Sequence, residues 1–152
     1  MRMLALLPFL LPQPGVLVPG TSLGGLRLGA TPAQVERTWG RFHGTCRGCA
    51  HRTWYFTYQR FDRHGAGVEF RHGRVAAIFT LWQPTGWRTS RGLALGAPSA
   101  QVSTLYGALP NVRCGTYTAL TQVRRRSVTA FYLVGDTVWG FGLMRPQVPV
   151  CR

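Results

Sequence analysis

The sixteen residues GLRLGATPAQVERTWG at positions 25–40 decide how this chain is organised, because they recur as GLALGAPSAQVSTLYG at positions 92–107. The two stretches lie 67 residues apart, and nine of their sixteen positions are identical. Chance does not readily give such a match, and similarity at a fixed spacing is the signature of repeated supersecondary units. The sequence therefore predicts two copies of one structural unit.

Each copy of the stretch predicts a short helix. Thr31 is a favourable N-cap, Gln34 occupies the capping-box position, and Gly40 is a natural stop. The second helix is expected over residues 99–106 and is followed by Gly107.

Three stretches rich in β-branched and aromatic residues follow each helix, and such residues favour strands. They cover residues 53–60, 67–72 and 75–82, and then residues 117–124, 128–134 and 137–144. Runs of adjacent strands imply antiparallel pairing. We therefore expect an α+β fold in which two tandem helix-plus-three-strand repeats form one antiparallel sheet with both helices packed on one face. Repeat 1 would cover residues 23–90 and repeat 2 residues 91–152, together forming one domain.

The repeated phrase Leu-x-Leu-Gly-x-(Thr/Pro)-x-Ala-Gln-Val, with a glycine after the helix, resembles tandem repeats of the β-lactamase-inhibitory-protein fold. It also resembles the SmpA/OmlA small envelope-lipoprotein domains. The resemblance implies an exported protein that binds other proteins and uses no cofactor. In the inhibitory members an aromatic-rich concave sheet face grips an enzyme, but nothing here points to a β-lactamase as the target. The SmpA/OmlA members are anchored by a lipidated cysteine, which this chain lacks.

The charge balance is strongly basic. All 18 basic residues are arginine, only four residues are acidic, and the formal net charge is +14. A GC-rich bacterial genome explains the choice of arginine but not the scarcity of acids. The positive field attracts anions such as acidic proteins, lipid headgroups and anionic envelope polymers. Nucleic acid is not favoured, because the arginines are scattered apart from one run at 124–126 and no nucleic-acid-binding motif accompanies them.

Residues 1–22 predict a signal peptide or a disordered N-terminal segment. Met1-Arg2-Met3 precedes a short apolar run at residues 4–11, which prolines then interrupt. The run is too short to span a membrane, and no later stretch is long and apolar enough to do so. The segment lacks a small-x-small cleavage site and a cysteine for lipid attachment. We expect a secreted or extracytoplasmic bacterial protein.

Four cysteines, Cys46, Cys49, Cys114 and Cys151, fit two disulfides in an oxidising compartment. Our preferred pairing joins Cys46 to Cys49 and Cys114 to Cys151, among three possible pairings. The first pair is also a CxxC motif, which leaves a thiol–disulfide protein as an alternative. A redox-active pair would precede a helix in a βαβ setting, whereas this one follows a helix. A zinc knuckle would need two further ligands, and no second tight pair exists.

Alternation along the predicted strands sorts side chains onto two faces of the sheet. It places Phe79 and Trp139 in the core beneath the helices. It places a mixed aromatic and arginine set on the open face, and such a surface favours protein interfaces. From that set we expect a protein partner, with acidic partners fitting the charge, to bind at Tyr55, Arg71, Trp82 and Phe131.

The sequence contains few of the residues and motifs that catalysis commonly uses. Nucleophile-elbow, phosphate-loop and dinucleotide motifs are absent, and the four acids form no obvious carboxylate pair. We expect a protein that is not an enzyme, with no catalytic residues, no metal and no cofactor. Binding of an anionic envelope polymer or of lipid headgroups stays open as an alternative function.

Overall fold

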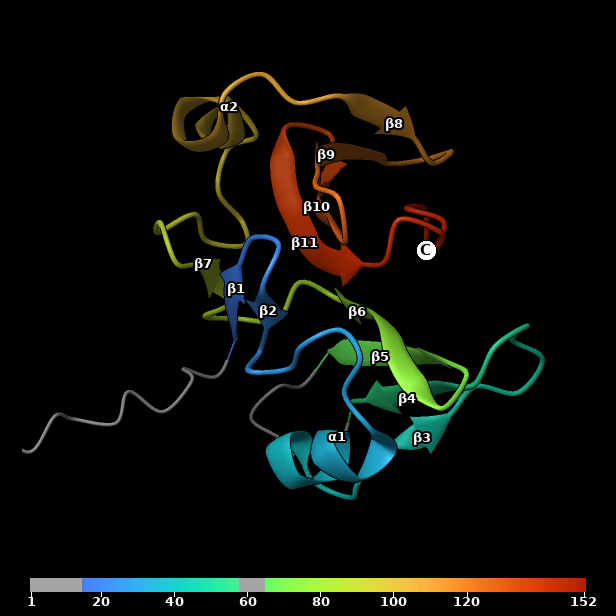
Figure 1. Ribbon diagram of the computed structural model, residues 1–152. Coiled ribbons are helices and arrows are strands. Elements are labelled where there is room, and N and C mark those ends of the chain that lie inside the picture. The colour runs from blue at the N-terminus through green and yellow to red at the C-terminus, as the bar shows by residue number, and fades with distance from the viewer. Residues whose placement is uncertain (1–14, 58–64) are drawn as a thin grey trace, which may run out of the picture.

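The computed structural model describes residues 15–57 and 65–152, which form one large sheet, one small sheet and two short helices (Figure 1). The helices are α1 (Pro32–Trp39) and α2 (Ala100–Tyr106). The strands are β1 (Val16–Val18), β2 (Ser22–Leu23), β3 (Gly44–Thr45), β4 (Thr53–Phe56), β5 (Ala66–Arg71), β6 (Arg74–Thr80), β7 (Arg88–Thr89), β8 (Asn111–Arg113), β9 (Thr118–Val123), β10 (Val128–Val134) and β11 (Thr137–Met144).

The large sheet has eight strands in the order β3-β4-β5-β6-β11-β10-β9-β8, and every neighbouring pair is antiparallel. Its centre is the β6–β11 pair, where Phe79 lies opposite Gly142 and Ile78 opposite Leu143. The small sheet has the order β2-β1-β7, and β1 runs parallel to β7. Figure 1 shows α1 beside the β3–β5 end of the large sheet and α2 near the β8–β9 end.

The predicted α+β fold of two tandem helix-plus-three-strand repeats is wrong. The described chain is mostly sheet, because α1 and α2 contain only 8 and 7 residues. Four strands, not three, follow each helix within the large sheet, and the small sheet is separate. The missed strands are two or three residues long and include Gly44–Thr45 and Arg88–Thr89. Pairing with neighbours forms such strands, and their composition carries little signal.

Both helices begin and end near the expected residues. Thr31 Oγ1 accepts from the backbone N–H of Gln34 at 3.2 Å, and Gln34 Oε1 accepts from that of Thr31 at 2.8 Å. This capping box satisfies two free donors of the first turn. α1 ends at Gly40, whose φ of 93° suits glycine. α2 has Ser99 as its N-cap without a side-chain bond and ends at Gly107.

The apolar side chains form a separate cluster on each face of the large sheet. The first cluster contains Val35 and Trp39 of α1 and Val102 of α2, packed against residues such as Phe56 and Phe141. The second lies on the face away from the helices and includes Ala77, Phe79, Ala130, Tyr132 and Met144. We call the second face the open face.

Two β-bulges change which side chains reach the open face. The β5–β6 register pairs Glu69 with Ala77 and Phe70 with Val75, so Ala76 is an extra residue in β6. The β10–β11 register likewise shifts past Trp139. An extra residue inverts the alternation that follows it. Phe79 therefore lies in the open-face cluster, and its predicted place beneath the helices is wrong.

Residues 15–22 belong to the folded structure. Leu17 of β1 is fully buried, and the strand pairs with β2 and β7. This part of the predicted N-terminal segment 1–22 is thus ordered by the small sheet. The apolar run at residues 4–11 lies outside the described residues. Among the residues that the structure describes, no helix is both long and apolar enough to cross a membrane.

Candidate functional site

A groove of about 1060 Å³ crosses the open face of the large sheet and is open to solvent on one side. Its floor is largely aromatic and contains Tyr55, Phe79, Tyr132 and Trp139. Ligand sites in proteins typically enclose about 300–1,000 Å³ and are lined by apolar and aromatic groups with a few polar ones. The groove has that character, and Trp82, which is 55% exposed, stands at its margin.

Glycine in the floor makes room for the aromatic rings. A Cβ atom on Gly67 of β5 would lie 2.8 Å from the ring of Phe79 and 3.3 Å from the carbonyl oxygen of Trp54. The missing side chain lets the Phe79 ring approach β5 closely. The local shape of the groove therefore depends on a residue that contributes no side chain to it.

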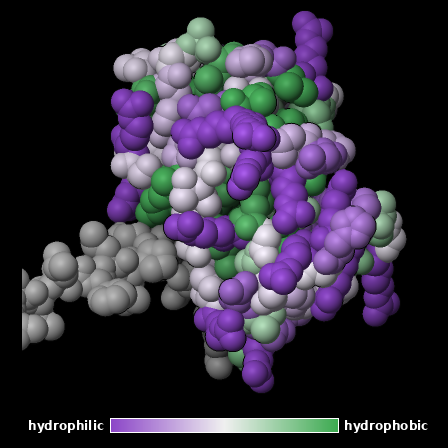
Figure 2. All heavy atoms as spheres, in the orientation of Figure 1, coloured by the Kyte–Doolittle hydropathy of each residue, from purple (hydrophilic) through white to green (hydrophobic). Residues whose placement is uncertain are grey.

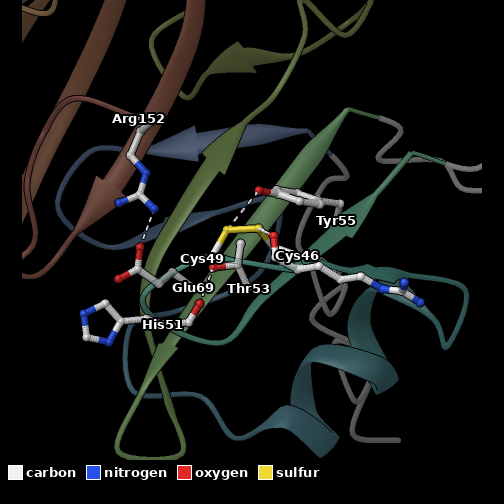
Figure 3. Close-up of a disulfide and its surroundings, with 8 residues drawn as sticks. Cys46, Cys49, His51, Thr53, Tyr55, Glu69 and Arg152 are labelled. Atoms are coloured by element: carbon white, nitrogen blue, oxygen red, sulfur yellow. Dashed lines mark hydrogen bonds and ion pairs between the residues drawn. A yellow bond between two sulfur atoms is a disulfide. The ribbon is translucent and has the colours of Figure 1, made fainter.

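Both disulfides border the groove. Cys46–Cys49 and Cys114–Cys151 are present in the pairing that we expected, with Cα atoms 5.8 and 5.3 Å apart. Figure 3 shows Cys49 beside the hydroxyl of Tyr55, and these atoms are 3.7 Å apart. Cys49 and Cys151 both line the groove. The Cys46–Cys49 bond closes a tight turn within the β3–β4 loop, whereas Cys114–Cys151 ties the last residues of the chain to the residue that follows β8.

The Cys46–Cys49 bond lies in the loop between β3 and β4 and is not at the start of a helix. Low-pKa redox cysteines usually occupy a helix N-terminus or a site beside cations. The first of these features is absent here, whereas Arg47 lies between the two cysteines.

Residues 145–152, which we call the C-terminal strap, lie on the open face and form part of the groove. The Tyr132 hydroxyl donates to the Val150 carbonyl at 2.6 Å, and the backbone N–H of Arg152 donates to the Tyr117 hydroxyl at 2.7 Å. Tyr117 also donates to the Arg152 carbonyl. Val148 is buried in the open-face cluster. Two tyrosines and one disulfide thus hold a segment that belongs to no strand.

Glu69 is the buried carboxylate of the groove, with 5% of the residue exposed. Arg71 Nε donates to its Oε1 at 2.8 Å, and Arg152 Nη2 donates to its Oε2. Figure 3 shows Arg152 reaching from the strap to Glu69 on β5. Burial acts to raise the pKa of Glu69, but hydrogen bonds and charge from Arg152 and Arg71 together lower it below 4.5.

The guanidinium of Arg152 is held at a second point. Its Cζ atom lies 4.5 Å from the centroid of the Phe79 ring. Such cation–π contacts contribute about 0.5–2 kcal/mol, depending on how far the cation is desolvated. The Arg152 side chain remains 19% exposed and lines the groove. Two guanidiniums, those of Arg71 and Arg152, therefore meet the single side-chain carboxylate of Glu69 at this end of the groove.

Three of the four predicted partner-binding residues lie in or beside the groove. Tyr55 and Trp82 line it, and Arg71 is 24% exposed where it pairs with Glu69. Phe131 is fully buried on the helix side, with its ring centroid 4.9 Å from that of Tyr106, so its predicted place on the open face is wrong. Strand β10 is apolar on both faces, so its residues carry no polar alternation that would identify the inner side.

Sequence reasoning missed several residues of the site. Strand alternation predicts Phe79 and Trp139 in the core, because nothing in the sequence marks the two β-bulges. Tyr117, Tyr132 and Arg152 were not singled out, because the contacts that bring the strap to β5, β9 and β10 span 18 to 83 residues. The available signal is the aromatic residues of β10 and Tyr117 directly before β9.

The histidines of the described chain do not gather into a metal site. His43 lies 3.1 Å from Glu36 and stacks on Trp54 with ring centroids 3.8 Å apart. His51 is exposed at the margin of the groove. Within residues 15–57 and 65–152, no three His, Cys, Asp or Glu side chains come together in a way that could hold a metal ion.

Comparisons with known proteins show the fold alone. No family model and no curated protein matches the chain. A solved extracellular protein containing a SCP domain from Bacillus anthracis is similar with a TM-score of 0.58 at 7% identity, over 78% of this chain and 44% of that one. The DUF4309 family protein YjgB from Bacillus subtilis is similar with a TM-score of 0.52 at 12% identity, over 81% of this chain and 84% of that one. The chain thus spans less than half the length of the first of these structures.

Proposed function

We propose that this chain is an exported, non-catalytic binding module that docks a protein partner in the groove on its open sheet face. The observation that carries the proposal is a solvent-open groove whose floor and margin are built from tyrosine, tryptophan and phenylalanine, with a guanidinium at one end. Tryptophan, tyrosine and arginine are the residues that dominate binding energy at protein interfaces. The resemblance of the repeated stretches to inhibitory proteins that bind through a concave sheet face also supports it.

The place of action that we propose is outside the bacterial cytoplasm. Two disulfides and no free cysteine among the described residues favour an oxidising compartment. The basic start and apolar run at residues 1–11 have the layout of a secretory leader.

A second candidate function is attachment to anionic envelope polymers or lipid headgroups. The exposed run Arg124-Arg125-Arg126 between β9 and β10 favours it. Figure 2 shows hydrophilic side chains spread over the visible face of the molecule, and this distribution does not favour binding through one charged patch.

Capture of a partner by groove variants tests the proposal. Immobilised full-length protein would be incubated with native culture fluid and envelope extract, and bound proteins would be compared between variants. Trp82→Ala and Tyr55→Ala are expected to lose the captured partner, because each removes a ring from the groove. Phe42→Ala is the matched control, because Phe42 is 77% exposed and does not line the groove.

Folding of each variant would be checked by its thermal midpoint, which should change little because Trp82 is exposed and Tyr55 only half-buried. A partner retained equally by all three variants contradicts the proposal. Capture that disappears when Arg124, Arg125 and Arg126 are replaced, but not when Trp82 is, favours the envelope-polymer function instead.

A further inference from the structure

We propose that the groove recognises a polypeptide segment in which an aspartate or glutamate is flanked by apolar or aromatic side chains, with the carboxylate bound by Arg152. This inference rests on the proposed function and names the chemistry of the partner segment. It follows from the charges at the strap end of the groove and from the apolar character of the rest.

The first step is that Glu69 is not free to bind a cationic ligand. Arg71 donates to one carboxylate oxygen and Arg152 to the other. A basic ligand would have to displace one of these guanidiniums from a carboxylate that is 5% exposed. Breaking a buried, hydrogen-bonded ion pair is costly, so the site does not favour cations.

The second step is that Arg152 keeps donors for an anion. A guanidinium has five N–H donors, and one of them is given to Glu69. The Phe79 ring and the Glu69 carboxylate fix the position of the group, and Tyr117 pins the backbone behind it. A guanidinium held in advance loses little entropy when it pairs with a carboxylate, and its planar fork suits that partner.

The third step concerns what lies next to the carboxylate. The Phe79 ring lies against the Arg152 guanidinium, and the same groove is lined by Tyr132, Tyr55, Trp139, Leu81 and Val134. Apolar and aromatic side chains of a ligand would bury area on this floor at roughly 25 cal/mol per Å². A segment that is acidic throughout would leave this floor uncovered.

A polypeptide fits the open shape of the groove better than a lipid tail. The groove is open to solvent on one side, so an isolated alkyl chain would stay exposed along its length. A segment of a folded partner brings its own body to cover the opening. The net charge of +14 would also steer an acidic partner toward this protein.

Selection from a library of random seven-residue peptides displayed on phage tests the inference, with the full-length protein as bait. We expect groove-dependent sequences to share one Asp or Glu next to apolar or aromatic residues. The selected peptide and its amide analogue, with Asn or Gln in place of the acid, would then be titrated against the wild-type protein. Loss of one charged hydrogen-bonded contact predicts about a tenfold or larger weakening for the amide analogue.

The protein variant Glu69→Gln/Arg152→Met completes a double-mutant cycle. It removes both charges together, so no buried carboxylate is left unpaired, and methionine keeps a stem to pack on Phe79. The acidic peptide and its amide analogue should bind this variant with equal affinity. Trp82→Ala should weaken both peptides by the same factor, because it changes the aromatic margin of the groove and not the charge pair.

The outcomes separate the inference from the proposed function. A groove-dependent consensus that is neutral or basic, or an acid preference that survives in the double variant, overturns the inference and leaves the binding function standing. If Trp82→Ala weakens the binding of no selected peptide, the inference and the proposed binding function are both contradicted. Trp82-dependent binding to phosphatidylglycerol vesicles without any such peptide would also overturn both, in favour of a lipid ligand.

Discussion

At the residue scale, the groove is organised around one buried carboxylate in a chain with only four acidic residues. Glu69 joins strand β5 to the C-terminal strap, because its second oxygen accepts from Arg152 across 83 positions of sequence. Its first oxygen accepts from Arg71 on the same strand. One side chain therefore fixes both the floor of the groove and the position of the cation beside it.

The stabilising effect of Glu69 should depend on pH. The pKa of Glu69 is lower in the folded protein than its ordinary value of 4.5, so the ionised carboxylate stabilises the folded state. This stabilisation is complete at a pH above 4.5. It is lost as the pH falls through the lower pKa of the folded protein. The charged side chains that act on Glu69 are Arg152 and Arg71, which donate to its two oxygens. Burial raises the pKa of Tyr132 far above its ordinary value, so this tyrosine stays neutral across the acid range.

Glu69→Gln should lower the free energy of unfolding by about 1–3 kcal/mol near neutral pH, because it removes charged hydrogen bonds from a buried position. The difference from wild type should shrink below pH 4.5, where the wild-type carboxyl also becomes neutral. Urea unfolding across the pH range measures the loss of unfolding free energy near neutral pH and its decrease at acid pH. Asp136→Asn, at the exposed β10–β11 turn, is the control, and a pH-independent loss for Glu69→Gln would contradict the charge argument.

At the element scale, the C-terminal strap forms part of the groove without belonging to the sheet. Its backbone is held mainly by side-chain hydroxyls of Tyr117 and Tyr132 and by the Cys114–Cys151 bond. Such a segment would detach at lower cost than a paired strand. The disulfide is therefore the contact on which the shape of that side of the groove depends most.

The two disulfides should differ in their effect on stability. Cys114 and Cys151 are 37 positions apart and Cys46 and Cys49 only 3, so the chain-entropy model gives about 4 kcal/mol for the first and about 2 kcal/mol for the second. Cys114→Ser/Cys151→Ser should therefore lower the free energy of unfolding more than Cys46→Ser/Cys49→Ser. Urea unfolding without reductant compares the two variants.

The same pair of variants tests the role of the strap in binding. The loss of Cys114–Cys151 should weaken the selected peptide more than the loss of Cys46–Cys49, because Arg152 would lose its fixed position. Equal losses of stability and affinity in both variants would mean that the strap stays in place without its disulfide.

At the scale of the whole molecule, the two faces of the antiparallel sheet have different roles. One face carries the helices and the small sheet and buries residues such as Trp39 and Phe141. The other face is covered only partly by the strap and leaves the groove exposed. The net charge of +14 acts at longer range than the contacts within the groove.

Salt should therefore slow association with an acidic partner more than it speeds dissociation. Raising ionic strength from about 0.02 M to about 0.2 M shortens the Debye length about threefold and screens the long-range field. For the selected acidic peptide, the association rate should fall about tenfold or less, with the contacts in the groove keeping the complex together. Stopped-flow intrinsic tryptophan fluorescence, to which Trp82 and Trp139 contribute from the groove, would follow both rates. Complete loss of binding at the higher salt would instead favour attachment by charge alone.

The sequence by itself determined both helices and their glycine stops, the six longer strands to within a few residues and the net charge, and it favoured one of three cysteine pairings, which the structure then showed. These features follow from local patterns: a capping box, a β-branched run, a spacing of cysteines. Only the tertiary structure decided which aromatic rings line the groove. The bulges at Ala76 and Trp139 arise from how neighbouring strands pair, and each inverts the alternation from which a face is inferred. The strap and Glu69 meet through contacts between distant parts of the chain, which no local pattern encodes.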